Sequence, residues 1–204
     1  MLYSTFRLAR EANACKASYR KFAKFKGGVR EWGEDNPFPL TEVLDVCGLD
    51  DAFWSLSYAI KENENERDRI VCLFACDCAE RVLPLFEKVN PEDKRPRAAI
   101  ETSRKFISGE ATQEELAAAR AAARAAAWVA SDATWAARAA AWAASDAAWA
   151  ASDAASAASA ARAATWAASD ARAATWAASD ASDTARAAER QWQKGHVKEL
   201  LEGE

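Results

Sequence analysis

An alanine-rich tract without helix-breaking residues occupies the second half of this 204-residue chain. Between positions 111 and 190, 42 of the 80 residues are alanine, and neither glycine nor proline occurs from Glu110 to Lys194. Alanine is the strongest helix former, so the tract is expected to be helical. As one helix it would extend for roughly 130 Å, whereas a compact chain of this length has a radius of gyration of about 17 Å. The tract is therefore predicted to fold back as two or three packed antiparallel helices, with a turn near residues 156–159.

The first 110 residues have an ordinary globular composition and carry most of the large aliphatic and aromatic side chains. Pro84 lies inside one long helical pattern, and Pro96 suits the first turn of another helix. Thr41 is placed to cap a short helix from Glu42 to Cys47. The sequence thus predicts an all-α helical bundle in which residues 1–110 supply the aliphatic core. Residues 111–204 form repeat helices packed on that core, and the two parts together make one domain.

Charge and cysteine content narrow the class of protein further. Charged residues make up 28% of the chain, and every stretch long enough to span a bilayer contains some of them, so no transmembrane helix is expected. The N-terminus lacks the apolar segment of a secretory signal, and an odd number of cysteines suits a reducing compartment. A cytoplasmic protein is therefore predicted.

The net charge of −4 is unevenly distributed along the chain. Residues 1–30 contain eight basic residues and one acidic residue, whereas residues 31–110 contain ten basic and eighteen acidic residues. These opposite charges are expected to pair within the fold. Because the chain is not basic overall, binding to nucleic acid is not expected, and neither is binding to a membrane.

Four nonamers in the alanine tract repeat one pattern of arginine, tryptophan and aspartate. They span Arg124–Asp132, Arg138–Asp146, Arg162–Asp170 and Arg172–Asp180. In each nonamer these three residues stand at positions i, i+4 and i+8, which places them on one helix face. Trp128, Trp135, Trp142 and Trp149 also recur every seven residues, which predicts one stripe along a single helix.

The repeat admits two interpretations. In the structural one, alanine faces let helices approach closely, tryptophans fill the space between them, and each arginine lies over the indole one turn away. In the functional one, an arginine–tryptophan–aspartate row faces outward as a binding surface. The candidate binding residues are Arg124, Trp128, Asp132, Arg138, Trp142, Asp146, Arg162, Trp166, Asp170, Arg172, Trp176 and Asp180.

Nothing in the sequence predicts catalysis, a cofactor or a metal site. Cys72, Cys76 and Cys78 lack the spacing of a zinc motif, and we expect buried thiols that act as small apolar groups. The single histidine, His196, cannot be paired with a nucleophile from sequence spacing. The chain is therefore expected not to be an enzyme.

Several stretches of the chain resemble one family. These are Leu49–Leu56, Leu73–Glu87, Asp93–Glu101 and Ala188–Gln193, together with the tract between the last two. They are similar to the all-α "putative immunity protein" family of bacterial polymorphic toxin systems, over about residues 40–195. The resemblance implies a cytoplasmic protein that binds and neutralises a partner toxin without catalysing a reaction. The regular nonamer repeat is a departure from that family.

The leading functional prediction is therefore a non-enzymatic immunity protein that neutralises a cognate toxin by stoichiometric binding. A second hypothesis is an anti-defence protein, of bacterial or phage origin, that sequesters a nucleotide-like signal in an arginine–tryptophan pocket. A third is a structural protein that self-associates into homo-oligomers through its tryptophans. An enclosed pocket would favour the second, and a long exposed tract that pairs with another copy would favour the third.

Overall fold

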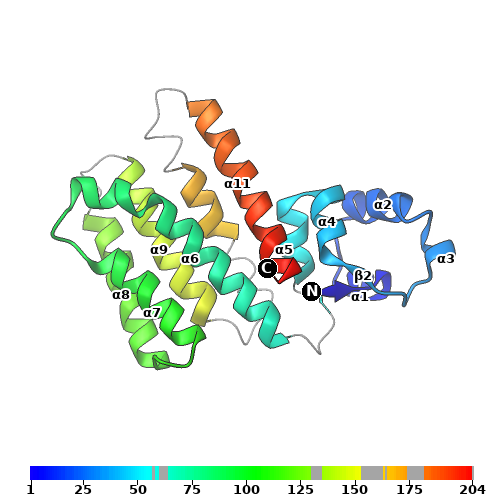
Figure 1. Ribbon diagram of the computed structural model, residues 1–204, viewed down its shortest axis with the longest axis horizontal. Helices are drawn as coiled ribbons and strands as arrows, with labels where there is room; N and C mark the ends of the chain where they lie inside the picture. The colour runs from blue at the N-terminus through cyan, green and yellow to red at the C-terminus, as the bar shows by residue number, and fades with distance from the viewer. Residues whose placement is uncertain are drawn as a thin grey trace.

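The computed structural model describes residues 1–56, 58–59, 64–129, 135–152, 163, 165–173 and 182–203 (Figure 1). Side chains within these ranges are described except at positions 64, 65, 128, 129, 135, 136, 138, 152 and 182. The described chain is predominantly helical, with one short pair of strands, so the predicted all-α class and helical bundle are confirmed.

Short elements build the N-terminal end of the molecule, at the right in Figure 1. They are β1 (Tyr3–Ser4), α1 (Phe6–Glu11), α2 (Lys16–Phe25), α3 (Val29–Trp32), β2 (Phe38–Pro39), α4 (Leu40–Cys47) and α5 (Leu49–Leu56). Strands β1 and β2 pair antiparallel. Phe6, Phe22 and Phe38 are buried against one another, with the Phe22 and Phe38 ring centroids 4.7 Å apart. An aromatic cluster therefore holds this end together.

Two details of this end bear on the sequence predictions. The predicted cap at Thr41 is wrong, because α4 begins at Leu40 and Thr41 lies inside its first turn. The fixed backbone of Pro39 already suits the residue before a helix, so no side-chain cap is needed at Thr41. Part of the expected charge pairing is present, since Lys26 Nζ lies 2.6 Å from Glu42 and Arg7 donates to Asp35.

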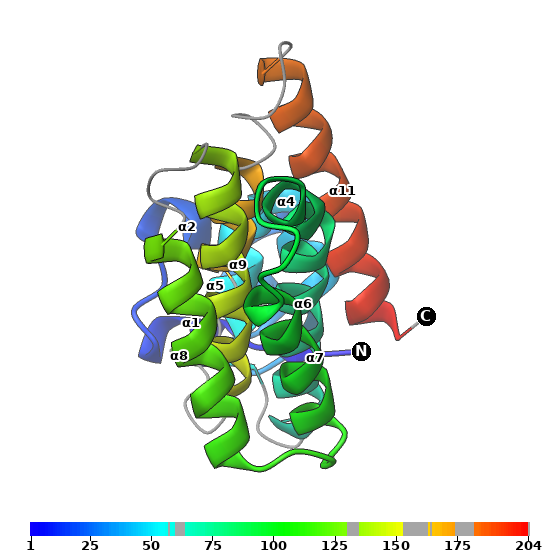
Figure 2. The same ribbon diagram turned by 90° about the vertical axis from the view of Figure 1, so that its left-hand side faces the viewer.

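Long helices pack together at the other end of the molecule (Figure 2). These are α6 (Glu64–Val89), α7 (Arg95–Ile107), α8 (Gln113–Val129) and α9 (Trp135–Ser152). Helix α9 is central and packs against the other three. Its described alanines are at most 5% exposed, and those of its middle turns are fully buried. Small side chains on every side thus let three helices surround α9 closely.

A capping box starts α8, and the predicted place of Pro96 is confirmed. Thr112 Oγ1 accepts the Glu115 backbone N–H at 3.2 Å, and Glu115 accepts the Thr112 N–H at 2.8 Å, which together cap α8. Pro96 lies in the first turn of α7, where its missing N–H costs nothing. Helix α6 continues through Pro84.

The single tryptophan stripe predicted from the seven-residue spacing is wrong. Helix α8 ends at Val129 and α9 begins at Trp135, so Trp128 lies on a different helix from Trp135, Trp142 and Trp149. A constant spacing keeps residues on one stripe only while the helix is continuous. The predicted turn at 156–159 lies outside the described residues.

The C-terminal helix α11 (Ser182–Glu202) crosses between the two ends and packs on α6 and α4 (Figure 1). Its own Val197 and Leu201 are buried, and its Lys198 Nζ lies 2.9 Å from Asp45. A further helical segment, residues 165–173, precedes it. In the described part of the structure, no helix has the length and apolar character that crossing a bilayer requires.

Candidate functional site

The structure describes the side chains of six of the predicted binding residues. They are Arg124 on α8, Trp142 and Asp146 on α9, and Trp166, Asp170 and Arg172 on segment 165–173. Trp128 and Arg138 lie in α8 and α9, but their side chains are not described. Asp132, Arg162, Trp176 and Asp180 lie outside the described residues, so their role stays a prediction.

The contacts seen among these side chains join different nonamers rather than residues of one nonamer. Arg124 lies over the ring of Trp142, with its guanidinium carbon 5.6 Å from the ring centroid. Arg120 lies over Trp149 in the same way at 4.8 Å. Because the arginines ascend along α8 while their partners descend along α9, the two helices run antiparallel, as predicted. Arg120 was not a predicted site residue, since it precedes the first nonamer.

Segment 165–173 adds a further tryptophan, Trp166, to the stacked arginines and tryptophans of α8 and α9. The ring centroids of Trp149 and Trp166 are 4.9 Å apart, with their planes inclined at 48°. We call Arg120, Arg124, Trp142, Trp149 and Trp166 the arginine–tryptophan surface. Trp142 and Trp149 are partly buried against the core, whereas Trp166 is 44% exposed. A surface of this composition contains the residue types that dominate protein-binding energies.

Two carboxyl groups of equivalent repeat positions face each other beneath this surface. Asp146 on α9 is hydrogen-bonded to Asp170 on segment 165–173, and both are partly buried. Burial raises the pKa of Asp146 well above its ordinary value, and the neighbouring Asp170 raises it further. Burial also raises the pKa of Asp170, although its hydrogen bond from Asp146 opposes this shift. Two adjacent carboxyls cannot both ionise cheaply, so the pair shares one proton.

This shared proton determines the charge of the arginine–tryptophan surface. Arg120 and Arg124 both lower the pKa of Asp146 through electrostatic attraction. Among the described residues, no carboxylate lies within ion-pair distance of either guanidinium group. The protonated pair carries about one negative charge against the two positive charges of the arginines. The described charged groups of this surface are therefore net positive, in a protein whose overall charge is negative.

A second polar cluster fastens α11 to α6. Arg81 pairs with the buried carboxylate of Glu189 at 3.1 Å and lies over the ring of Trp192 at 4.0 Å. Trp192 stacks on His196 with the ring centroids 4.9 Å apart. His196 Nε2 in turn lies 2.7 Å from Asp77 Oδ2 on α6. These contacts join two helices that the alanine tract separates in sequence.

The cysteines of α6 are buried, as predicted. Cys72, Cys76 and Cys78 are free thiols, and burial raises the pKa of all three, that of Cys76 to about 12. Such thiols stay protonated at neutral pH, and a metal ligand must be a thiolate. Within the described ranges, no group of three or more histidine, cysteine, aspartate or glutamate side chains is arranged to hold a metal ion.

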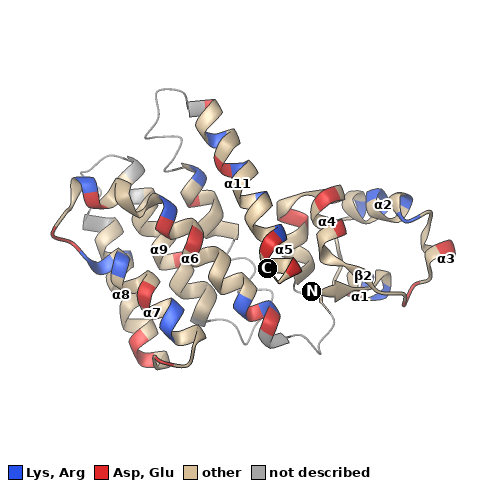
Figure 3. Ribbon diagram, viewed as in Figure 1, with Lys and Arg blue, Asp and Glu red and all other residues tan. Residues whose placement is uncertain are grey.

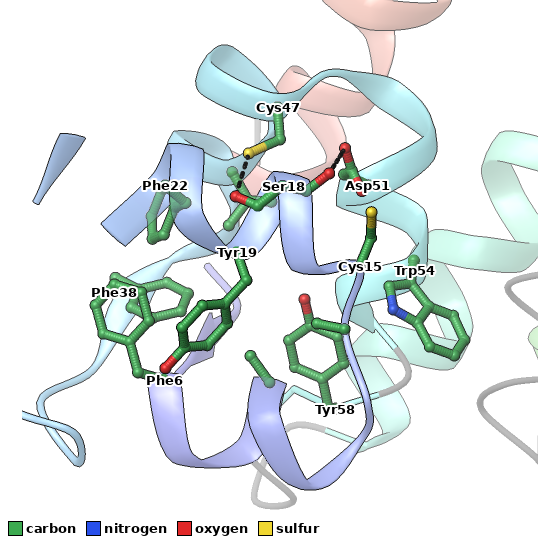
Figure 4. Close-up of a pocket in the computed structure, with 13 residues that line it drawn as sticks. Phe6, Cys15, Ser18, Tyr19, Phe22, Phe38, Cys47, Asp51, Trp54 and Tyr58 are labelled. Atoms are coloured by element: carbon green, nitrogen blue, oxygen red, sulfur yellow. Dashed lines mark hydrogen bonds between the residues drawn. The ribbon is translucent and has the colours of Figure 1, made fainter. Parts of the chain in front are cut away.

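A small cavity lies at the N-terminal end, between α1, α2 and α5 (Figure 4). Its lining includes Phe6, Tyr19, Trp54 and Tyr58, with Cys15 at one side. Its volume is about 30 Å³, which is space for one or two water molecules rather than an organic ligand. None of the predicted site residues lines it.

Comparison with known proteins gives one match. A family model described as "Imm-5 like putative immunity protein" matches residues 61–200, more than half of the chain. The match confirms the resemblance drawn from the sequence motifs, although Leu49–Leu56 lies outside the matched residues. No curated protein and no solved structure matches the chain.

Proposed function

We propose that this chain, which belongs to the Imm-5 like putative immunity protein family, neutralises a cognate toxin by binding it stoichiometrically. The contact is made by the arginine–tryptophan surface on α8, α9 and segment 165–173. The observation that carries this proposal is the exposed Trp166, which lies against Trp149, the tryptophan whose ring Arg120 covers.

The surface has the physical properties of a binding hot spot. Trp149 and Trp142 are held by the core and by the arginines above them, so they lose little side-chain entropy on binding. Trp166 offers a large apolar ring to a partner, and a buried tryptophan can contribute 2 kcal/mol or more to affinity. The helices beneath are packed through alanine and cannot easily rearrange. A rigid and preformed surface of this kind suits tight inhibition by occlusion.

A stable complex needs more than these five side chains. Protein pairs of standard size bury about 800 Å² on each partner. The arginine–tryptophan surface would form the centre of such an interface, and the exposed side chains of the neighbouring turns of α8 would form its rim. The predicted nonamer residues outside the described ranges are proposed to take part in the same interface.

The test begins with the native host. The tagged chain is purified under non-denaturing conditions, and the retained protein is identified by mass spectrometry. The gene of that protein is then expressed alone and together with this chain. We expect growth arrest in the first case and full rescue in the second.

Matched variants then locate the contact. Trp166→Ala and Arg124→Ala should each weaken the complex by about 30-fold or more, as loss of a hot-spot residue of about 2 kcal/mol does. Trp54→Ala, which removes another exposed tryptophan from the distant helix α5, should leave affinity unchanged. Rescue that survives both surface variants would refute the assigned surface. Retention of a nucleotide with no protein partner would overturn the immunity function itself.

A further inference from the structure

Three arginines gather where segment 165–173 meets the N-terminal half of α11. Arg172 Nη1 donates to Gln193 Oε1 at 2.7 Å, and Gln193 Nε2 donates to the Ala168 carbonyl at 3.0 Å, which fixes Arg172 against α11. Arg190 and Arg186 precede Gln193 by one and two helical turns and share its face of α11. We call Arg172, Arg186 and Arg190 the arginine triad. Figure 3 shows basic residues along this half of α11 and on the neighbouring segment.

The three positive charges of the arginine triad are not neutralised by a direct ion pair with any described residue. Arg172 is partly buried, and burial lowers its pKa; Asp50 opposes this shift, while Arg190 and Arg186 add to it. In the described part of the chain, no carboxylate lies within ion-pair distance of any member of the triad. The buried Glu189 on the same helix already pairs with Arg81 and accepts from Gln193 at 3.2 Å. A partly buried guanidinium group that has no carboxylate within ion-pair distance is costly to the free protein.

An open hollow lies beside the arginine triad. Its volume is about 490 Å³, and it is lined by Asp183, Arg186, Ala187, Arg190 and Gln191. These residues form one exposed face of α11, in the half of the helix that projects beyond the bundle (Figures 1 and 2). Sites for small molecules are typically of about this size. The hollow therefore offers space for a ligand next to the unmatched charge.

We propose that the arginine triad binds a phosphate-bearing small molecule, with the guanidinium groups donating to its phosphate oxygens. Planar guanidinium forks match the oxygens of a phosphate in pairs. Three positive charges are better balanced by a phosphate or diphosphate than by a single carboxylate. Asp183 and Gln191 at the rim accept hydrogen bonds from hydroxyl groups, which fits a nucleotide or a sugar phosphate. This proposal goes beyond the proposed function and does not rest on it.

Calorimetric titration of the full chain with inorganic pyrophosphate tests this site. At low ionic strength we expect saturable binding of one pyrophosphate per chain. Arg172→Gln and Arg190→Gln should each weaken binding by at least tenfold. Arg30→Gln, which removes an exposed arginine from α3 at the far end of the molecule, should leave binding unchanged. Arg190 is exposed, so its replacement keeps the test valid if Arg172→Gln fails to fold.

A parallel titration separates phosphate chemistry from general attraction of anions. Glutarate, a dicarboxylate with two negative charges, should bind at least tenfold more weakly than pyrophosphate. Equal binding of the two anions would overturn the phosphate assignment. The proposal would also be overturned by binding that does not saturate, or by equal affinity in the wild type and in both triad variants.

Discussion

The close packing of α9 predicts that one added side chain will be poorly tolerated in its middle. Ala144 is fully buried, and α9 is enclosed by α6, α7 and α8. Replacing Ala144 with leucine adds three carbon atoms where two helix backbones approach each other. Overpacking of this kind costs about 1–3 kcal/mol. Because Ala144 is fully buried and its neighbours Ala143 and Ala147 are as well, we expect the upper end, about 3 kcal/mol.

Thermal and urea denaturation measure this loss directly. In a domain of this size, 1 kcal/mol corresponds to about 2–4 °C in Tm, so Ala144→Leu should lower Tm by about 6–12 °C. The matched control is Ala125→Leu on the exposed face of α8, which should change stability by no more than about 0.5 kcal/mol. If Ala144→Leu is as stable as Ala125→Leu, then α9 is not enclosed by closely spaced helices and the architecture described above is refuted.

Three further predictions concern helix propensity and proton binding. Gly195 lies inside α11, where an added methyl group meets open space, so Gly195→Ala should raise the free energy of unfolding by about 0.5–1 kcal/mol in urea denaturation. The hydrogen bond to Asp77 raises the pKa of His196, so the free energy of unfolding should fall as pH rises above about 6.5. His196→Gln has no titrating ring and should not show this fall. A variant with the same pH profile as the wild type would contradict the role given to His196. Folding raises the pKa of Asp146, so the wild type should lose stability as pH rises above the ordinary aspartate range. Asp146→Asn keeps a donor to Asp170 but has no proton to lose, so its stability relative to the wild type should increase with pH; a constant difference from pH 5 to 9 would show that the pair shares no proton.

Local features of the sequence predicted local features of the fold. The helix start at Thr112 and Glu115 was predictable because both partners of the capping box lie within four residues. Pro96 marked the start of α7 because backbone N–H groups in the first turn of a helix have no partner within the helix, so a proline there loses no hydrogen bond. The all-α class followed from alanine content and the rarity of glycine and proline. The start of α4 was mispredicted, because Pro39 replaced the side-chain cap expected from Thr41.

The candidate site was predicted in composition but not in geometry. The nonamer pointed to arginine, tryptophan and aspartate, and the structure places Arg124 over Trp142 and Asp146 beside Asp170. Their role in binding a partner stays a prediction. Helical periodicity shows which face a residue occupies, but not which helix that face will meet. The sequence therefore suggested stacking within one helix, whereas Arg124 stacks on Trp142 across two helices. Arg120 was missed because it belongs to none of the nonamers. Only the folded protein shows that it lies over Trp149, as Arg124 lies over Trp142.

Antiparallel packing of a repeated sequence also explains why two acidic groups meet. When a helix turns back on a copy of its own pattern, a position of one repeat can face the equivalent position of the next, and Asp146 and Asp170 do so. A shift of segment 165–173 by one turn along α9 would relieve this repulsion, but it would also separate Trp149 from Trp166. The pair can instead share one proton, because a protonated carboxyl can donate to its neighbour. The tryptophans thus fix the register, and the aspartates adapt by changing their protonation.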